Sequence, residues 1–403
     1  MEEMRKFVLK NACLLANCMI FFLISCQSNQ YEERSDEIEK LNKENFISYD
    51  LIRSKAVSLF EKILTEHPGG GNKVRSNPLE DEFPTRTISN ILTFNDNRNI
   101  TSCYAVNFYE GGFIVISADK RVPEILAFSE DNSFMPNPEE SNEEMPYGVT
   151  IWLNNVNNII SAIRYDSLEN EDLNNSDNDK DKGLDNYSNE VTTRDFPTPS
   201  TPYMLTTKWG QSNGYNDSLS ICNVSTGQKM VSGCATVAIA QLLKYFPNST
   251  YYTYKWFLME DNYATPETAK LYKHIVSISH ATAIGCDTTS TSIGYVLITF
   301  STYGFSYTNS IYNFNTVKTY LLNNSPVFIY GGNHGWVCDG YFYSEEIIPN
   351  LLDPNNPKIV IKNFLHMNWG WSGSYNGWYD EATTWSPPGY TCPDNDRNVI
   401  YIY

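Results

Sequence analysis

One cysteine stands where its thiol could act as a nucleophile. Cys234 follows Gly233 and opens an apolar run that ends at Phe246, just before Pro247. Apolar residues on nearly every face predict a buried central helix. A thiol in the first turn of that helix would face free backbone N–H groups and the positive end of the helix dipole, and both favour the nucleophilic thiolate. The alternative is a buried structural cysteine, the commoner fate of a lone cysteine.

A thiolate of this kind needs a base, and the chain beyond residue 200 offers four histidines, His274, His280, His334 and His366. The first two lie in a predicted helical stretch, where ordinary surface or packing roles suffice. His334 lies between two strand-like runs, in a centre that contains Gly331, Gly332 and Gly335. Glycines bring the backbone close and leave an imidazole accessible. His334 is therefore the predicted base.

A third segment could orient that base. A strand-like run over residues 360–364 leads into a turn rich in glycine and tryptophan. In this turn the amide of Asn368 could hydrogen-bond the far ring nitrogen of His334 and fix its tautomer, while Trp369 shields the contact from water. The alternative is a turn that only packs, which is the interpretation we prefer for its other tryptophans.

Four linked motifs run through the second half of the chain. They read Trp-x-Gln-x-x-x-Tyr-Asn, Gly-Cys-Ala-Thr-Val, Gly-Gly-Asn-His-Gly followed by Val-Cys-Asp-Gly, and Asn-Trp-Gly-Trp, at residues 209–216, 233–237, 331–340 and 368–371. In this combination and order they resemble the streptopain (C10) family of papain-fold cysteine peptidases. The resemblance covers residues 205–380.

The resemblance implies a role for each site residue. Cys234 would be the nucleophile, His334 its base, and Asn368 or Trp369 the residue that orients His334. Gln211 would supply the side chain of the oxyanion hole. This is chemically reasonable, because a side-chain amide and the N–H of Cys234 could together bind the tetrahedral oxyanion.

Two positions depart from the family pattern. Asn333 is inserted between the glycine pair and His334, and Gly335 replaces the usual alanine. Because a small residue is retained after the base, we expect an altered local backbone but a working site.

The N-terminal half carries its own helix and strand patterns. Apolar spacing predicts two helices and three strands, over residues 49–64 and 151–163 and over residues 88–94, 104–108 and 112–117. The last two strands flank Tyr109-Glu110-Gly111, which predicts a hairpin. Residues 104–108, 112–123 and 125–129 also resemble the C10 family's inhibitory propeptide, which occurs as a free inhibitor too.

The charge distribution indicates two units with different roles. Of the formal net charge of −18, residues 1–200 carry −15 and residues 201–403 only −3. Residues 165–200 hold ten acidic and three basic side chains with little apolar surface, so we expect a mobile linker. The predicted organisation is a signal peptide (1–25), a tether (26–45), an inhibitory propeptide (46–164), this linker with the activating cleavage (165–200) and a peptidase domain (201–403).

The first residues have the form of an export signal. Arg5, Lys6 and Lys10 precede an apolar run over residues 12–24 that is too short for a comfortable membrane span. The run ends in Leu-Ile-Ser-Cys, which resembles a bacterial lipobox and predicts lipidation of Cys26. The alternative is an ordinary secretory signal that contains a cysteine. No second hydrophobic run of spanning length follows, so the expected anchor is lipid alone.

The remaining cysteines give no clear framework. Cys13 and Cys18 leave with the signal peptide, Cys26 is the expected lipid site and Cys234 the expected nucleophile. An odd number of cysteines remains: Cys103, Cys222, Cys286, Cys338 and Cys392. Without CxxC pairs a zinc site is disfavoured, and no metal or organic cofactor is expected. Export permits a disulfide, but the sequence does not assign one.

Together these observations predict an α+β protein, a papain-like two-lobed domain preceded by a small α+β propeptide domain. The expected function is that of an exported, lipid-anchored cysteine endopeptidase zymogen on the periplasmic side or cell surface. Its partners would be protein or peptide substrates, its own propeptide and the membrane; nucleic acid is not expected, because no basic stripe occurs. The alternatives are a catalytically silent surface-binding lipoprotein of the same fold and a related thiol enzyme such as a transglutaminase or amidase.

Overall fold

The computed structural model describes residues 39–66, 86–134, 145–165, 200–247, 253–349, 356–381 and 397–403. The predicted signal peptide, Cys26, residues 166–199 of the predicted acidic linker and Cys392 lie outside these residues. The chain divides into two compact units, residues 1–46 with 162–180 and residues 47–161 with 181–403. The second unit holds all other predicted site residues and is the one considered below. No helix in the described part of the chain is both long and apolar enough to cross a membrane.

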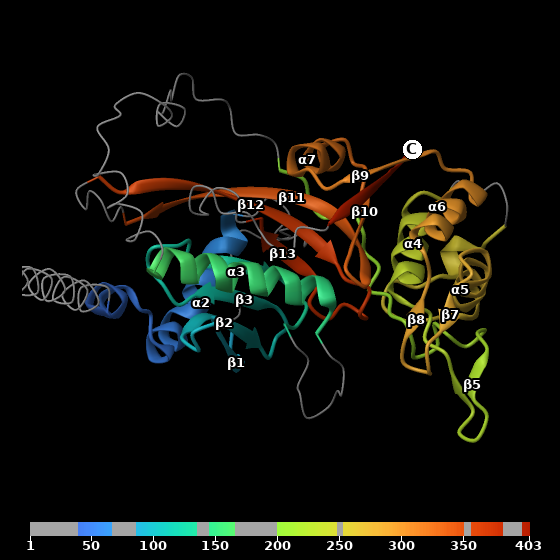
Figure 1. Cartoon of the computed structure of the whole chain (residues 1–403), viewed down its shortest axis with the longest axis horizontal. Coiled ribbons are helices and arrows are strands. Elements are labelled where there is room, and N and C mark those ends of the chain that lie inside the picture. Colours follow the sequence, from blue (N-terminus) through green and yellow to red (C-terminus); the bar gives the residue numbers. More distant parts are fainter. Residues whose placement is uncertain are drawn as a thin grey trace, which may run out of the picture. The chain divides into compact units, whose positions relative to one another are not determined.

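The second unit is built on a sheet of ten strands in the order β1-β2-β3-β4-β13-β12-β11-β10-β14-β9 (Figure 1). The first four strands are β1 (Ile88–Asn95), β2 (Thr101–Phe108), β3 (Phe113–Ser117) and β4 (Ile125–Ser129). The other six are β9 (Tyr307–Ile311), β10 (Val327–Gly331), β11 (His334–Ile348), β12 (Lys358–Asn368), β13 (Gly377–Asp380) and β14 (Asn398–Ile402). Every pairing in the sheet is antiparallel.

The N-terminal strands are covered on both faces. Helix α2 (Tyr49–Glu66) packs Ile52, Phe60 and neighbouring apolar residues against one face, together with Ile114 of β3. Side chains alternate across a strand, so Phe113 points to the other face, where it meets Tyr379. Helix α3 (Tyr147–Tyr165) covers that face. The predicted hairpin of β2 and β3 is confirmed by their pairing, and α3 begins four residues before the predicted helix.

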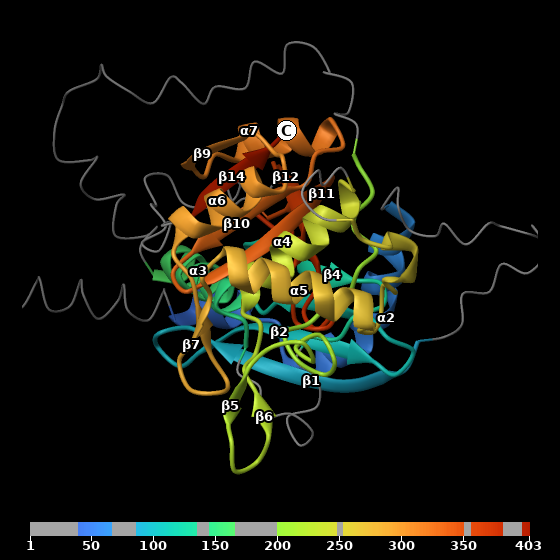
Figure 2. The same ribbon diagram turned by 90° about the vertical axis from the view of Figure 1, so that its right-hand side faces the viewer.

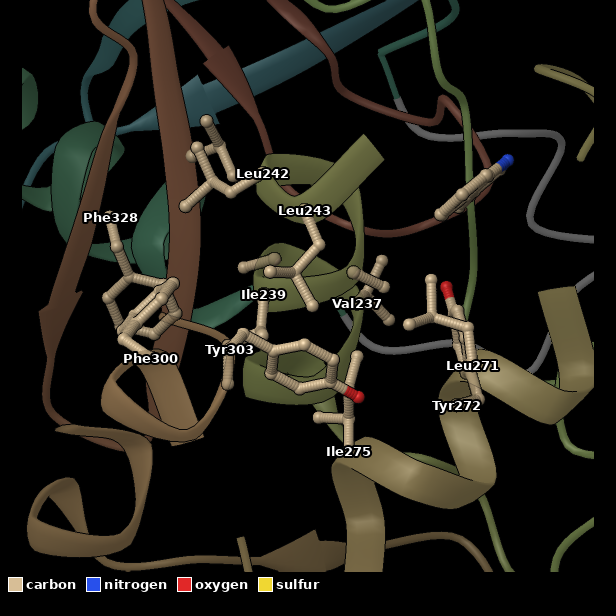
Figure 3. Close-up of a cluster of buried hydrophobic side chains, with 14 of the residues drawn as sticks. Val237, Ile239, Leu242, Leu243, Leu271, Tyr272, Ile275, Phe300, Tyr303 and Phe328 are labelled. Carbon is tan, nitrogen blue, oxygen red and sulfur yellow. The ribbon is translucent and has the colours of Figure 1, made fainter. Parts of the chain in front are cut away.

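The C-terminal half places helices against β10, β11 and β14 (Figure 2). These are α4 (Cys234–Tyr245), α5 (Pro266–Ile278) and α6 (Ile293–Thr302). Figure 3 shows Ile239 and Leu243 of α4 among side chains of α5 and α6, with Phe328 of β10 alongside. The continuous run from Thr236 to Leu243 is buried, which confirms the prediction of a central helix that is apolar on nearly every face.

Small elements complete this half. They are η1 (Trp256–Leu258), α7 (Phe314–Leu322), the hairpin of β5 (Ile221–Asn223) with β6 (Gln228–Lys229), and the hairpin of β7 (Thr282–Ala283) with β8 (Thr289–Ser290). The sequence placed His280 in a helical stretch, and this is wrong for that residue: α5 ends at Ile278, and His280 follows with a φ of 47°.

The two halves share one sheet, which the sequence did not reveal. Strand β4 pairs with β13, setting Phe128 opposite Trp378 and Ala127 opposite Tyr379. One apolar cluster contains Phe128, Phe342, Phe364 and Trp378. The propeptide-like half is therefore attached to the rest both by main-chain hydrogen bonds and by a common core.

Candidate active site

Cys234 is the first residue of α4, as the sequence predicts. It follows Gly233, which caps the helix with a φ of 84°, a backbone conformation that residues other than glycine adopt only at a cost. Space is also short there, since a Cβ on Gly233 would lie 3.3 Å from the side chain of Thr289. The thiol is half-buried, and the apolar packing of α4 fixes its position.

His334 is the first residue of β11 and is 8% exposed. Gly331 pairs with His334, so Gly332 and Asn333 alone form the turn between β10 and β11. Gly332 has a φ of 55°, which such a two-residue turn requires. The inserted Asn333 thus becomes part of a tight hairpin that presents the imidazole at its end.

The hairpin brings its backbone and the imidazole to the Cys234 thiol. The N–H of Gly335 donates to Sγ of Cys234 at 3.4 Å, and Sγ lies 4.0 Å from the carbonyl oxygen of Asn333. Burial acts to raise the pKa of the Cys234 thiol. His334, by its charge and a hydrogen bond, together with the N–H groups of Gly335 and Ala235, outweighs this and lowers that pKa below its ordinary value. The arrangement favours a thiolate.

Two tryptophans flank the imidazole. The centroid of the His334 ring lies 5.7 Å from that of the Trp336 ring, with an angle of 16° between the ring planes. The corresponding values for the Trp369 ring are 6.3 Å and 29°. Nε1 of Trp369 donates a hydrogen bond to the carbonyl of Tyr375 at 3.1 Å, which holds the indole in place. Nε2 of His334 is buried and has no hydrogen-bond partner in the described part of the chain. On the Nε2 side, aromatic packing and not a polar partner therefore holds the ring.

The predicted contact between Asn368 and His334 is not found in the structure. Nδ2 of Asn368 donates to the carbonyl of Thr207 at 2.8 Å. Its Oδ1 accepts from Nε2 of Gln241 at 3.2 Å and from the N–H of Gly370 at 3.3 Å. The amide is satisfied by these partners, so Asn368 ties α4 and the segment around Thr207 to the turn after β12.

Gln211 lies close to the loop before the nucleophile. Its carbonyl accepts from the N–H of Ser232 at 3.0 Å, and its side chain is partly exposed. The main chain of Gln211 is thus fixed to a residue two positions before Cys234.

Two of the other histidines beyond residue 200, His366 and His274, have polar partners of their own. Nδ1 of His366 and Oδ1 of Asp339 are 2.6 Å apart, both residues are buried, and Tyr203 stacks on the imidazole with centroids 4.6 Å apart. Nδ1 of His274 lies 2.8 Å from the hydroxyl of Tyr254. The sequence motif already contained Asp339 but gave no reason to pair it with His366.

The sequence also missed a contact from α3. Tyr147 lies against Gly332, where a Cβ would be 1.8 Å from Cε1 of the tyrosine. A Cβ on Gly148 would lie 2.3 Å from Cζ3 of Trp369. The start of α3 therefore touches both the hairpin that carries His334 and the tryptophan beside it.

Comparisons with known proteins fit this arrangement. Residues 209–379 match the Peptidase C10 family, and residues 61–160 match the family described as Spi protease inhibitor. The chain is 23% identical to streptopain of Streptococcus pyogenes, over 69% of this chain and 73% of that protein. It is 20% identical to the thiol protease/hemagglutinin PrtT of Porphyromonas gingivalis, over 66% of this chain and 32% of that protein.

A solved structure shares the fold. The prointerpain A fragment of Prevotella intermedia superposes with a TM-score of 0.50 at 20% identity, covering 78% of this chain and 98% of the fragment. The α+β, papain-like fold with an N-terminal propeptide domain is thereby confirmed.

Proposed function

Because the chain belongs to the peptidase C10 family and is a cysteine-type endopeptidase with an inhibitor-type propeptide, we propose that Cys234 and His334 are its catalytic pair. The observation that carries the proposal is the Cys234 thiol, whose pKa is lowered by His334 and by the N–H of Gly335 against the effect of burial. A thiolate formed in this way is a nucleophile at neutral pH.

The pair would act in the following order. Sγ of Cys234 bonds to the carbonyl carbon of the substrate, and the carbonyl oxygen becomes an oxyanion. The His334 imidazolium gives its proton to the amine nitrogen as the C–N bond breaks. Water then attacks the thioester carbonyl while His334 takes a proton from the water. The C–S bond breaks, the carboxylic acid product departs, and Cys234 is again a thiolate beside the His334 imidazolium.

We assign the oxyanion hole to the N–H of Cys234 and the side chain of Gln211. The hydrogen bond from the N–H of Ser232 to the Gln211 carbonyl supports this assignment, because it ties the segment that carries Gln211 to the segment that carries Cys234. Trp369 and Trp336 would restrict the imidazole and keep water from it. Asn368 serves this site through the turn that it stabilises and not by direct contact with His334.

The propeptide would keep the zymogen latent through α3. Tyr147 and Gly148 occupy the space beside Gly332 and Trp369, where an extended substrate would approach His334. Nε1 of Trp152 donates to the carbonyl of Asp380 at 3.0 Å, and β4 is hydrogen-bonded to β13. Cleavage within residues 165–200, for which Arg194 is a candidate, would allow this half to leave.

We further propose that the zymogen is exported and held at the membrane by a lipid on Cys26. The supporting observation is the Leu-Ile-Ser-Cys sequence after a short apolar run. Release of the mature enzyme would follow from cleavage in the linker, since the anchor stays with the propeptide.

Casein hydrolysis tests the catalytic assignment. The chain from residue 27 is compared with the fragment 201–403, each with and without a thiol alkylator. The fragment should be active and the alkylator should abolish its activity. Undiminished activity of Cys234→Ala would refute the mechanism.

A further inference from the structure

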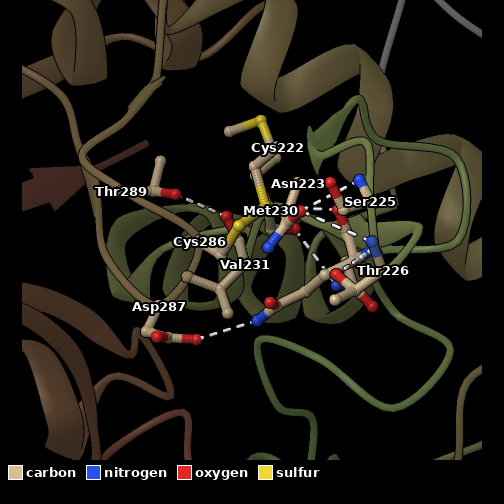
Figure 4. Close-up of a disulfide and its surroundings, with 11 residues drawn as sticks. Cys222, Asn223, Ser225, Thr226, Met230, Val231, Cys286, Asp287 and Thr289 are labelled. Carbon is tan, nitrogen blue, oxygen red and sulfur yellow. Dashed lines mark hydrogen bonds between the residues drawn. A yellow bond between two sulfur atoms is a disulfide. The ribbon is translucent and has the colours of Figure 1, made fainter.

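A disulfide lies next to the loop that carries the nucleophile (Figure 4). Cys222 of β5 is bonded to Cys286, 64 residues further along, in the loop between β7 and β8. The sequence alone left this pairing open. The disulfide joins the β7–β8 hairpin to the β5–β6 hairpin. The chain runs from β6 directly into the residues before Cys234.

The loop that holds Cys286 supports those residues. The N–H of Val231 donates to the carbonyl of Cys286 at 3.2 Å. The hydroxyl of Thr289 donates to the carbonyl of Val231 at 2.5 Å. The same Thr289 closes the space beside Gly233. Three successive contacts therefore pass from the disulfide loop to the residue that precedes the nucleophile.

The support continues to the proposed oxyanion hole. Ser232 lies between Val231 and Gly233, and its N–H holds the carbonyl of Gln211 at 3.0 Å. A shift of the 230–233 backbone would therefore move the N–H of Cys234 and the backbone of Gln211 together. A side-chain hydrogen bond also joins the two hairpins, from Nε2 of Gln228 to Oδ1 of Asp287 at 3.0 Å, and it is exposed.

We propose that Cys222 and Cys286 are positioning residues, and that their disulfide is a redox-sensitive brace for the nucleophile loop and the oxyanion hole. The proposal rests on the proposed function, since it assigns the brace to that site. Thr289 transmits the constraint. The enzyme would then need two opposite redox states at once, a reduced Cys234 and an oxidised Cys222–Cys286 pair.

Reduction of the brace is a thiol–disulfide exchange. A dithiol such as dithiothreitol attacks one sulfur, the S–S bond breaks, and the dithiol's second thiol displaces the mixed disulfide. The dithiol is oxidised to its cyclic disulfide, and Cys222 and Cys286 each gain a proton. Cys234 stays reduced throughout. A weak monothiol at low concentration would keep Cys234 reduced while leaving the brace intact.

The test uses the chain from residue 27, activated by the same protease treatment for every variant. Peptide hydrolysis, iodoacetamide labelling of Cys234 and thermal unfolding are measured for Cys222→Ala/Cys286→Ala, for Thr289→Val and for the matched control Thr289→Ser, which keeps the hydroxyl. Val224→Ala, at an 89% exposed position of the same hairpin, controls for changes at that surface. Mass spectrometry after alkylation counts the thiols in each redox state.

We expect the double variant and Thr289→Val to lose about tenfold or more in kcat, because small displacements of reacting groups are costly, with KM and Cys234 labelling little changed. Thr289→Ser and Val224→Ala should match the unmodified protein. Excess dithiothreitol should lower the activity of the unmodified protein to that of the double variant and leave the double variant unaffected.

Three outcomes would overturn the brace. They are a kcat within about twofold of the unmodified protein in the folded double variant, equal kcat in Thr289→Val and Thr289→Ser, and full activity after mass spectrometry shows the disulfide reduced. If the double variant does not fold, the comparison of kcat between Thr289→Val and Thr289→Ser tests the brace. Activity retained in Cys234→Ala would instead refute the catalytic assignment, so the two failures are distinguishable.

Discussion

The N–H of Gly335 lies 3.4 Å from Sγ of Cys234, although 101 residues separate the two along the chain. A Cβ on Gly335 would lie 2.7 Å from Cζ of Phe328. Phe328 is fully packed in the core that holds α4. Glycine at this position therefore lets the base strand approach the thiol while the neighbouring strand keeps a large aromatic side chain.

Gly335→Ala should move the N–H away from the thiol, because the new methyl group meets Phe328. We expect the pH midpoint of Cys234 alkylation to rise and peptide hydrolysis to fall. Gly335→Ala/Phe328→Leu should restore most of both by giving the methyl group room. Equal midpoints in the unmodified protein and in Gly335→Ala, with the fold intact, would contradict this role.

The pH dependence of labelling should identify the base. Since the pKa of Cys234 is lowered, its thiolate should persist as the pH falls below about 8.5, the ordinary thiol value. His334→Ala removes the favourable charge, so the midpoint should rise and hydrolysis should fall by roughly 10²-fold or more. His366→Ala should leave the midpoint in place, because His366 pairs with Asp339. A shift only in His366→Ala would mean that the wrong histidine is assigned.

Asn368 should contribute stability more than base chemistry. Asn368→Ala removes the buried hydrogen bonds that Nε2 of Gln241 and the Thr207 carbonyl make with Asn368, at a cost of about 1–3 kcal/mol in the free energy of unfolding. Gln241→Ala should be non-additive with it in a double-mutant cycle followed by denaturant unfolding. Were Asn368 instead the orienter of His334, Asn368→Ala would shift the pH profile of hydrolysis with little loss of stability.

Latency should depend on the glycine at the start of α3. Gly148→Ala places a methyl group against Trp369, so the propeptide should bind less well and the unprocessed chain should hydrolyse peptides faster. The matched control is Gly294→Ala in α6, where a Cβ meets nothing closer than 3.8 Å. Equal rates for the two variants, measured before any cleavage of the linker, would exclude this contact as a source of latency.

Membrane attachment should depend on Cys26. Cys26→Ala should leave the protein unlipidated and move it from the membrane fraction to the soluble fraction, or block its processing. Cys18→Ala, in the same leader, is the control and should fractionate normally. Membrane fractionation of Cys26→Ala like that of the unmodified protein would show that Cys26 is not the anchor.

The sequence predicted those features that local pattern determines. The apolar run after Cys234 predicted a buried helix, and α4 is buried from Thr236 to Leu243. Strand-like runs on either side of the glycine-rich centre predicted the two strands next to His334, and the structure pairs them as β10 and β11. Helical periodicity and turn glycines act over a few residues, so they can be recognised without knowledge of the fold.

Only the tertiary structure decided which distant groups meet. The amide of Asn368 faces Gln241 and not His334, Cys222 pairs with Cys286, and β4 joins β13 in one sheet. Each result depends on how segments tens to hundreds of residues apart pack, and one side chain can satisfy its hydrogen bonds with several alternative partners. The sequence therefore determined the chemical groups of the site and the elements that carry them, whereas packing determined their partners, since only the folded chain fixes the distances between them.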